Sequence, residues 1–312
     1  MDAEQILLTI IVAFSIFGNT TALYCLAKKK VNNYTILCIN LSISETLQSV
    51  FGYLPTFFLN KSSQEATLLC KLAAFFTAFP SFASISILTA VAISRVVLLE
   101  KPFLSNHSSN KTLFFKIGIA SWIYSLFWAS LPLLGLSCYT LEATRSRCAI
   151  NWTPKLLSEK IFLIILVIFI FFLPLLIILV SCLYTARVIR LKFKYFSNTY
   201  GKENIETKRF KSKENKAVSS FIIMVLTFVI CWAPYATIGL LSAFTSLAIP
   251  VVLLRVAALF SKLSAVVNPI IYYSKDNLYY NLTVAVKFRA SFLSKSFLIE
   301  DAKKITNNPC IS

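Results

Sequence analysis

The sequence predicts an all-α fold, a bundle of seven membrane-spanning helices followed by a short amphipathic helix. The 312 residues are 57% hydrophobic with a mean hydropathy of +0.73, which is too apolar for a soluble globular domain. Apolar runs recur along the whole chain, and each is about the 20 residues that an α-helix needs to cross a bilayer. The seven runs are 6–26, 35–59, 72–98, 113–136, 161–183, 218–244 and 251–273.

The placement of positive charge predicts the orientation in the membrane. The chain has 31 basic and 13 acidic residues, a net charge of +18, and the basic residues concentrate at 28–30, 187–216 and 287–304. Because basic loops stay on the cytoplasmic side, we expect a multi-pass protein of the cell membrane with its amino terminus outside and its carboxyl terminus inside. The basic segments would face anionic membrane lipid. No base-stacking module accompanies them, so we expect no nucleic-acid partner.

The residue types in this chain offer little support for an enzyme active site. His107 is the single histidine and falls in a predicted inner loop, so neither a metal site nor a Ser-His-Asp triad can be assembled. Six glycines and eight cysteines argue against a phosphate-binding loop and a disulfide-rich miniprotein. The first run lacks a preceding basic segment and is followed by three lysines at 28–30, which predicts an uncleaved span. We therefore expect no enzyme and no metal.

Polar residues inside the first two spans are predicted to join helices. Asn19 and Asn40 lie at mid-depth, where amide side chains usually hydrogen-bond between neighbouring helices. Glu45 differs because it carries charge, and an intramembrane acid is by default a functional residue.

The last apolar run carries one ammonium group near its midpoint. Lys262 lies within 251–273, about half a helix from either end. Ionisable residues at that depth are costly and mark functional sites by default. A lysine that snorkels its amine to the interface is the ordinary alternative, but the distance is long for this side chain. A desolvated lysine amine is a nucleophile that forms an imine with an aldehyde, and we favour this interpretation.

Two motifs resemble those of a known receptor family. Lys262 stands six residues before Asn-Pro-Ile-Ile-Tyr at 268–272, which resembles the Asn-Pro-x-x-Tyr motif of rhodopsin-like G-protein-coupled receptors. A lysine at this offset resembles the retinal-binding lysine of opsins, and Cys-Trp-Ala-Pro-Tyr at 231–235 is similar to their sixth-span motif. The resemblance implies a receptor domain at 1–290, which includes the membrane-surface helix at 276–288, and a cytoplasmic tail at 291–312.

The resemblance also implies which residues switch the receptor between states. Arg95 matches the arginine of the family's Asp/Glu-Arg-Tyr triplet, yet its neighbours here are Ser94 and Val96, so the local acid that would restrain it is absent. Tyr184 likewise stands two residues beyond the family's fifth-span tyrosine, whose position is taken by Cys182. The other implied activation residues are Glu214 below span six, Glu45 as the internal or sodium-site acid in place of the usual aspartate, and Asn268, Pro269 and Tyr272.

An outer disulfide is implied by the same resemblance. In this family a cysteine at the outer start of span three, here Cys70, pairs with a cysteine in the following outer loop. That loop supplies Cys138 and Cys148, and Cys148 matches the family's partner better. The outer face is an oxidising compartment, which favours the bond.

A protonated imine, or Schiff base, at Lys262 is a buried cation that needs an anion. Vertebrate visual opsins carry an acid three residues after the third-span cysteine, where this chain has Ala73, so the resemblance is to opsins of non-vertebrate-visual type. Glu142, six residues before Cys148, stands where many invertebrate opsins have a loop glutamate that serves as counterion. Six extended residues reach at most about 20 Å, which lets Glu142 fold over Lys262. A solvated loop carboxylate is the ordinary alternative.

Two arginines complicate this counterion. Arg145 and Arg147 share the loop with Glu142. A guanidinium near the imine would oppose its protonation, and one paired with Glu142 would divert the counterion. Two outcomes stay open: an unprotonated pigment that absorbs in the ultraviolet, or a site in which an inorganic anion such as chloride completes the charge balance.

The family's chromophore-lining positions fall on three predicted spans. Aromatic residues at helical spacing are usually ordinary core, but their convergence with Lys262 on one level of the bundle favours a binding site. Trp232 would pack against the chromophore and transmit its change of shape to span six, which Pro234 is expected to kink. The implied lining residues are Thr77, Ala78, Phe82, Leu166, Val167, Phe171, Phe228, Trp232, Tyr235 and Ala236.

The function implied by the resemblance is light sensing. Such a receptor binds 11-cis-retinal through Lys262 and activates a heterotrimeric G protein on photoisomerisation, with arrestin as a further partner. Two alternatives stay open. The altered triplet around Arg95 fits a retinal photoisomerase that does not signal, and a ligand-gated receptor of the same class is expected if Lys262 is incidental. Thr77 stands where amine receptors have their binding aspartate, which argues against amine ligands.

Overall fold

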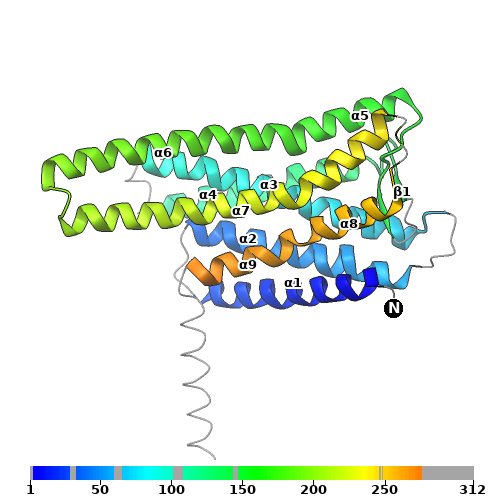
Figure 1. Ribbon diagram of the computed structural model, residues 1–312, viewed down its shortest axis with the longest axis horizontal. Coiled ribbons are helices and arrows are strands. Elements are labelled where there is room, and N and C mark those ends of the chain that lie inside the picture. Colours follow the sequence, from blue (N-terminus) through cyan, green and yellow to red (C-terminus); the bar gives the residue numbers. More distant parts are fainter. Residues whose placement is uncertain are drawn as a thin grey trace, which may run out of the picture. The chain divides into compact units, whose positions relative to one another are not determined.

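The computed structural model describes residues 3–28, 33–59, 65–100, 108–142, 147–245, 247 and 249–275. It confirms the predicted helix bundle (Figure 1). The predicted surface helix at 276–288, the tail at 291–312 and His107 lie outside the described residues. The elements are α1 (Ala3–Ala27), α2 (Asn33–Leu47), η1 (Gln48–Tyr53), η2 (Leu54–Phe58), α3 (Leu68–Glu100), α4 (Ser108–Ser130), β1 (Tyr139–Leu141), β2 (Cys148–Ile150), α5 (Leu157–Val167), η4 (Ile168–Phe172), α6 (Leu173–Tyr200), α7 (Ile205–Phe244), α8 (Val251–Lys262) and α9 (Ser264–Lys275).

Six helices in the described part of the chain are long and apolar enough to cross a membrane. The remaining predicted span, 35–59, is formed by α2, η1 and η2 in direct succession. It is less apolar than the others because it carries polar side chains, which are buried inside the bundle: Ser42, Ser44, Glu45 and Gln48. Polar groups that face protein instead of lipid are the usual arrangement within a membrane bundle.

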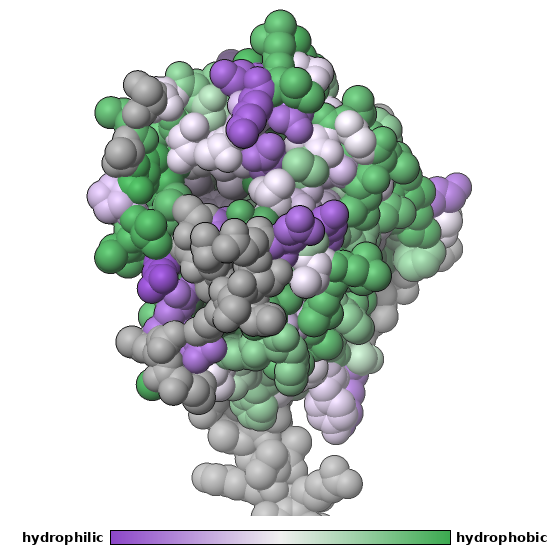
Figure 2. All heavy atoms as spheres, turned by 90° about the vertical axis from the view of Figure 1, so that its right-hand side faces the viewer, coloured by the Kyte–Doolittle hydropathy of each residue, from purple (hydrophilic) through white to green (hydrophobic). Residues whose placement is uncertain are grey.

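The third span is the centre of the bundle. Helix α3 packs against α2, α4, α6 and the β1–β2 hairpin, while α1 packs against α2 and α7 against α8. The hairpin and the start of α5 lie at one end of the bundle, near the amino terminus (Figure 1). Polar side chains occupy the middle of this end face and strongly hydrophobic side chains line its flanks (Figure 2). This distribution fits helices whose outer surfaces contact lipid.

In two of the spans that contain a proline, side chains from other helices take up the freed carbonyl groups. Pro174 follows the π-helical turn η4 and has no N–H to donate, and the carbonyl of Phe169 accepts a hydrogen bond from the Tyr124 hydroxyl at 2.9 Å. In span seven Pro269 leaves the carbonyl of Ala265 free, and Asn19 Nδ2 donates to it at 2.8 Å. The predicted helix-joining role of Asn19 is therefore confirmed.

Three helix ends differ from the predicted span boundaries. Helix α4 ends at Ser130, before the predicted 136, because the residue preceding Pro132 disfavours the helical conformation. Helices α6 and α7 continue to Tyr200 and start at Ile205, well beyond the predicted 183 and 218. A hydropathy pattern marks only the membrane-embedded part, and a charged helix can continue into water.

Candidate binding site around Lys262

A cavity at the hairpin end of the bundle brings together the predicted binding residues. Helices α3, α5, α7 and α8, the turn η4 and the outer loop each contribute to its wall. The predicted residues that line it are Ala73, Thr77, Ala78, Phe82, Glu142, Leu166, Val167, Phe171, Phe228, Trp232, Tyr235, Ala236 and Lys262. Most of these side chains are apolar or aromatic, so the cavity suits an elongated apolar ligand.

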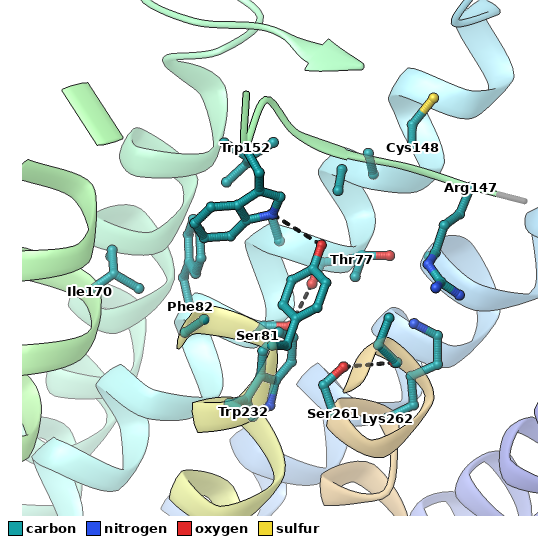
Figure 3. A pocket seen from close by; sticks show the side chains of 18 of the residues that line it. Thr77, Ser81, Phe82, Arg147, Cys148, Trp152, Ile170, Trp232, Ser261 and Lys262 are labelled. Carbon is teal, nitrogen blue, oxygen red and sulfur yellow. Dashed lines mark hydrogen bonds between the residues drawn. The ribbon is translucent and has the colours of Figure 1, made fainter. Parts of the chain in front are cut away.

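Lys262 is the last residue of α8, and its amine points into the cavity (Figure 3). The residue is only 5% exposed. Its Nζ lies 4.4 Å from the ring centroid of Tyr53, which places the amine over the aromatic face. Among the described residues no carboxylate oxygen lies within 4.0 Å of this Nζ. A buried amine without an acid partner is poorly stabilised as an ammonium ion, which favours the nucleophilic neutral form.

The outer loop is tied to the third span by the predicted disulfide. Cys70 and Cys148 are bonded, with a Cα–Cα distance of 5.3 Å, while Cys138 is free. Strands β1 and β2 pair antiparallel with Leu141 opposite Cys148, and the Glu142 amide donates to the Arg147 carbonyl at 3.0 Å. The hairpin therefore places both Glu142 and Arg147 at the cavity.

Both carboxylate oxygens of Glu142 are occupied by neighbours other than Lys262. Arg147 Nε donates to Oε2 at 2.7 Å, and the Tyr235 hydroxyl donates to Oε1 at 2.6 Å. Arg147 also donates through Nη1 to Glu4 Oε1 at 3.0 Å. Burial opposes the charge of Arg147, but Glu142, Tyr235 and Glu4 outweigh it and raise the pKa of the guanidinium. Glu142 is thus paired with an arginine of its own loop, which was one of the possibilities drawn from the sequence. The role of Glu142 as counterion stays a prediction.

Two aromatic lining residues, Tyr53 and Trp152, were absent from the sequence-based site. Tyr53 is 1% exposed and enters the cavity from the π-helical turn η1, a feature that leaves no periodic signal in sequence. Trp152 follows β2, and its Nε1 donates to the Tyr235 hydroxyl at 3.1 Å. Its indole lies against Gly239, where a Cβ atom would come within 2.4 Å of the ring. The sequence signal that could have identified Trp152 is its position four residues after Cys148, the cysteine that ties this loop to the third span.

Trp232 connects the cavity wall to span seven. Its ring lies 5.9 Å from that of Phe228 and 6.3 Å from that of Tyr235. Its Nε1 donates to the Ser264 hydroxyl at 3.2 Å, at the start of α9. Pro234, two residues further along α7, removes a backbone hydrogen bond from the helix beside this indole. The role of Trp232 in passing a change of shape to span six stays a prediction.

Two of the predicted activation residues, Glu45 and Asn268, are joined by a hydrogen bond inside the bundle. Glu45 Oε1 accepts hydrogen bonds from Ser84 at 3.1 Å and Asn268 at 3.2 Å, which joins spans two, three and seven. Ser94 donates to the Val91 carbonyl at 2.7 Å and offers no charge to the neighbouring Arg95. The side chains of Glu214 and Tyr272 lie outside the described residues. The activation roles of these residues stay predictions.

Tyr184, which stands two residues beyond the family's fifth-span tyrosine, hydrogen-bonds to an acid near the end of α3. Its hydroxyl donates to Glu100 Oε1 at 2.8 Å, linking α6 to α3. Lys192 donates to the carbonyl of Leu99 between the same two helices. These contacts hold the inner ends of spans three and five together.

Comparisons with known proteins agree with this geometry. Residues 18–272 match the family of seven-transmembrane receptors of the rhodopsin type. Melanopsin-B of Xenopus laevis is 31% identical over 86% of this chain and 53% of its own length, and a rhodopsin of Mizuhopecten yessoensis described as GQ-coupled is 24% identical over 85% and 55%. The chain thus spans about half the length of these relatives. The crystal structure of squid rhodopsin has a similar fold, with a TM-score of 0.80, 22% identity and coverage of 92% of this chain and 85% of its own.

Proposed function

Because this chain belongs to the rhodopsin family of seven-transmembrane receptors, we propose that it is an opsin, a light-sensing receptor that carries retinal on Lys262 and activates a G protein. The observation that carries the proposal is a buried amine, without an acid partner among the described residues, in a cavity walled by aromatic side chains. The similarity to melanopsins supports the same function.

The chemistry of the lining residues fits retinal. An apolar polyene requires apolar and aromatic walls, which Phe82, Phe171 and Phe228 supply, and an aldehyde requires an amine. The Lys262 amine would hold the aldehyde by condensation with loss of water, which needs no oxidant or reductant. Retinal then supplies absorption of light and a change of shape, beginning from the 11-cis isomer.

The residues of the chain would shield the attached nitrogen and transmit the change of shape. The hairpin, held by the Cys70–Cys148 bond, contributes to the cavity wall and would limit the access of water to the nitrogen. Trp232 would be pushed against its Ser264 partner, and the lower half of span six would tilt at Pro234. The basic inner ends of α6 and α7 would then contact a heterotrimeric G protein, and arrestin would bind the same inner face.

The location follows from the family and the charge pattern. The chain is a multi-pass membrane protein, and we propose an extracellular amino terminus, a receptor domain at 1–290 and a cytoplasmic tail at 291–312 near anionic lipid. Chloride would serve as auxiliary counterion only with a protonated Lys262 nitrogen. The charges of Glu4, Glu142, Arg147 and Arg255 already balance among themselves.

Absorption spectroscopy and nucleotide exchange test the proposal together. We expect protein expressed with 11-cis-retinal to show an absorption band that changes on illumination, and Lys262→Ala protein to show none. Light-dependent nucleotide exchange on a G protein is expected for the receptor, whereas illumination without exchange would favour the photoisomerase. A wild-type preparation that retains no retinal would contradict both.

A further inference from the structure

The cavity holds two buried basic side chains, Arg147 and Lys262, and among the described residues only Arg147 has acid partners. Arg147 is 6% exposed, and Glu142 and Glu4 accept its hydrogen bonds. Arg255 on α8 pairs with the other oxygen of Glu4 at 3.6 Å. Two carboxylates therefore face two guanidinium groups, and this outer cluster of Glu4, Glu142, Arg147 and Arg255 is neutral as a whole.

Lys262 faces the same side of the cavity as Arg147 (Figure 3). Ala73 lines the cavity at the position where vertebrate visual opsins carry an acid. The group that lies over the amine is the Tyr53 ring. An aromatic face attracts a cation more weakly than a carboxylate does. A proton on the Lys262 nitrogen would therefore add an unbalanced positive charge beside a guanidinium.

We propose that Arg147 makes this site hold the Lys262 nitrogen unprotonated once retinal is attached, so that the pigment absorbs in the ultraviolet at neutral pH. The inference rests on the proposed function. A conjugated imine absorbs in the visible when protonated and at shorter wavelength when neutral. Arg147 acts by position and charge, because it occupies the carboxylate that would otherwise stabilise the proton.

Titratable groups on every element around the nitrogen agree with this assignment. Glu142 and Arg147 of the loop and Tyr235 of span six line the cavity. Glu4 of span one is joined to Arg147 and to Arg255 of span seven by ion pairs, and Cys231 of span six is buried outside the cavity lining. Span two contributes Tyr53 at the amine and, outside the cavity lining, Glu45, which is held by Ser84 and Asn268. Each acid in this set already has a partner other than Lys262.

One nitrogen of Arg147 supports an alternative in which the Lys262 nitrogen is protonated. Arg147 Nη2 is buried without a hydrogen-bond partner among the described residues. A halide bound between this nitrogen and Lys262 would supply the missing negative charge and permit a protonated, visible-absorbing pigment. The experiment therefore compares chloride with a halide-free buffer.

The test is the absorption spectrum of the 312-residue protein reconstituted with 11-cis-retinal between pH 5 and pH 9. We expect an ultraviolet band at neutral pH in both buffers. Arg147→Gln should move the band into the visible, since Glu142 then faces the nitrogen without its guanidinium. Arg147→Lys, which keeps the charge, should stay in the ultraviolet, and Lys155→Gln, which removes an exposed positive charge from the same loop, should match the wild type.

Two results would overturn the inference: a visible band of the wild-type pigment at neutral pH in either buffer, or an Arg147→Gln band that remains in the ultraviolet. If Arg147→Gln does not fold, the wild-type spectrum and the Arg147→Lys spectrum still decide. Acid denaturation, which protonates any imine, separates this inference from the proposed function. A denatured sample without a protonated-imine band would contradict the proposed function itself.

Discussion

Two buried basic side chains share one cavity, and their surroundings differ sharply. Arg147 donates through Nε to Glu142 and through Nη1 to Glu4, and its Nη2 is buried without a hydrogen-bond partner among the described residues. Lys262 meets the face of Tyr53 and no carboxylate among the described residues. Similar burial thus accompanies a guanidinium paired with carboxylates at one position and an amine without a carboxylate partner among the described residues at the other. The difference assigns structure to Arg147 and chemistry to Lys262.

The largest expected effect comes from removing the acid on the Arg147 side. Glu142→Gln leaves a buried guanidinium with Glu4 as its remaining carboxylate, and the loss of one partner of a buried ion pair costs about 3–5 kcal/mol. We expect a clear drop in the thermal unfolding midpoint of the retinal-free protein in detergent.

The matched control for Glu142→Gln is the same substitution in an exposed pair. Glu203 pairs with Lys208, and its side chain is 88% exposed. Glu203→Gln should leave the midpoint unchanged, because solvent screens exposed ion pairs. Equal midpoints for the two variants would refute the structural role of the Arg147 pair.

A smaller effect is expected from the contact that positions Tyr235 beside Glu142. Gly239→Ala would place a Cβ atom 2.4 Å from the Trp152 ring, and overpacking of this kind costs about 1–3 kcal/mol. We expect a lower unfolding midpoint. Combining Gly239→Ala with Trp152→Leu should restore part of the loss, because the smaller side chain gives room. If the double variant is no more stable than Gly239→Ala alone, the steric account is wrong.

The smallest effect is expected on the Lys262 side. The Tyr53 hydroxyl is buried without a partner among the described residues, so Tyr53→Phe should be neutral or stabilise the protein by about 1 kcal/mol. The ring that covers the amine is kept in this variant. Tyr53→Leu, which removes the aromatic face, should lower the midpoint. Destabilisation by Tyr53→Phe as large as that by Tyr53→Leu would show that the hydroxyl, and not the ring, supports this side.

The sequence predicted the parts of the site that depend on local pattern. Lys262 stood out because a charged residue within an apolar run is rare. Its position six residues before Asn268 matched that of the retinal-binding lysine of opsins. Cys148 followed from the family arrangement and is bonded to Cys70.

The remaining parts of the site depend on chain geometry and long-range contacts. Arg147 reaches Glu4 across 143 positions of sequence, which no local pattern encodes. The π-helical turn that carries Tyr53 rotates the following residues by an amount that hydropathy does not reveal. The length of α7 was likewise underestimated, because its first turns are charged.

The central claim is that Lys262 is the covalent attachment point for retinal. The most direct test is borohydride reduction of the reconstituted protein followed by peptide mass spectrometry, which fixes the C=N bond as a stable amine wherever it formed. We predict a retinyl group on the peptide that contains Lys262, and none in Lys262→Ala protein. A retinyl group on a different lysine, or a photosensitive preparation of Lys262→Ala, would contradict the account.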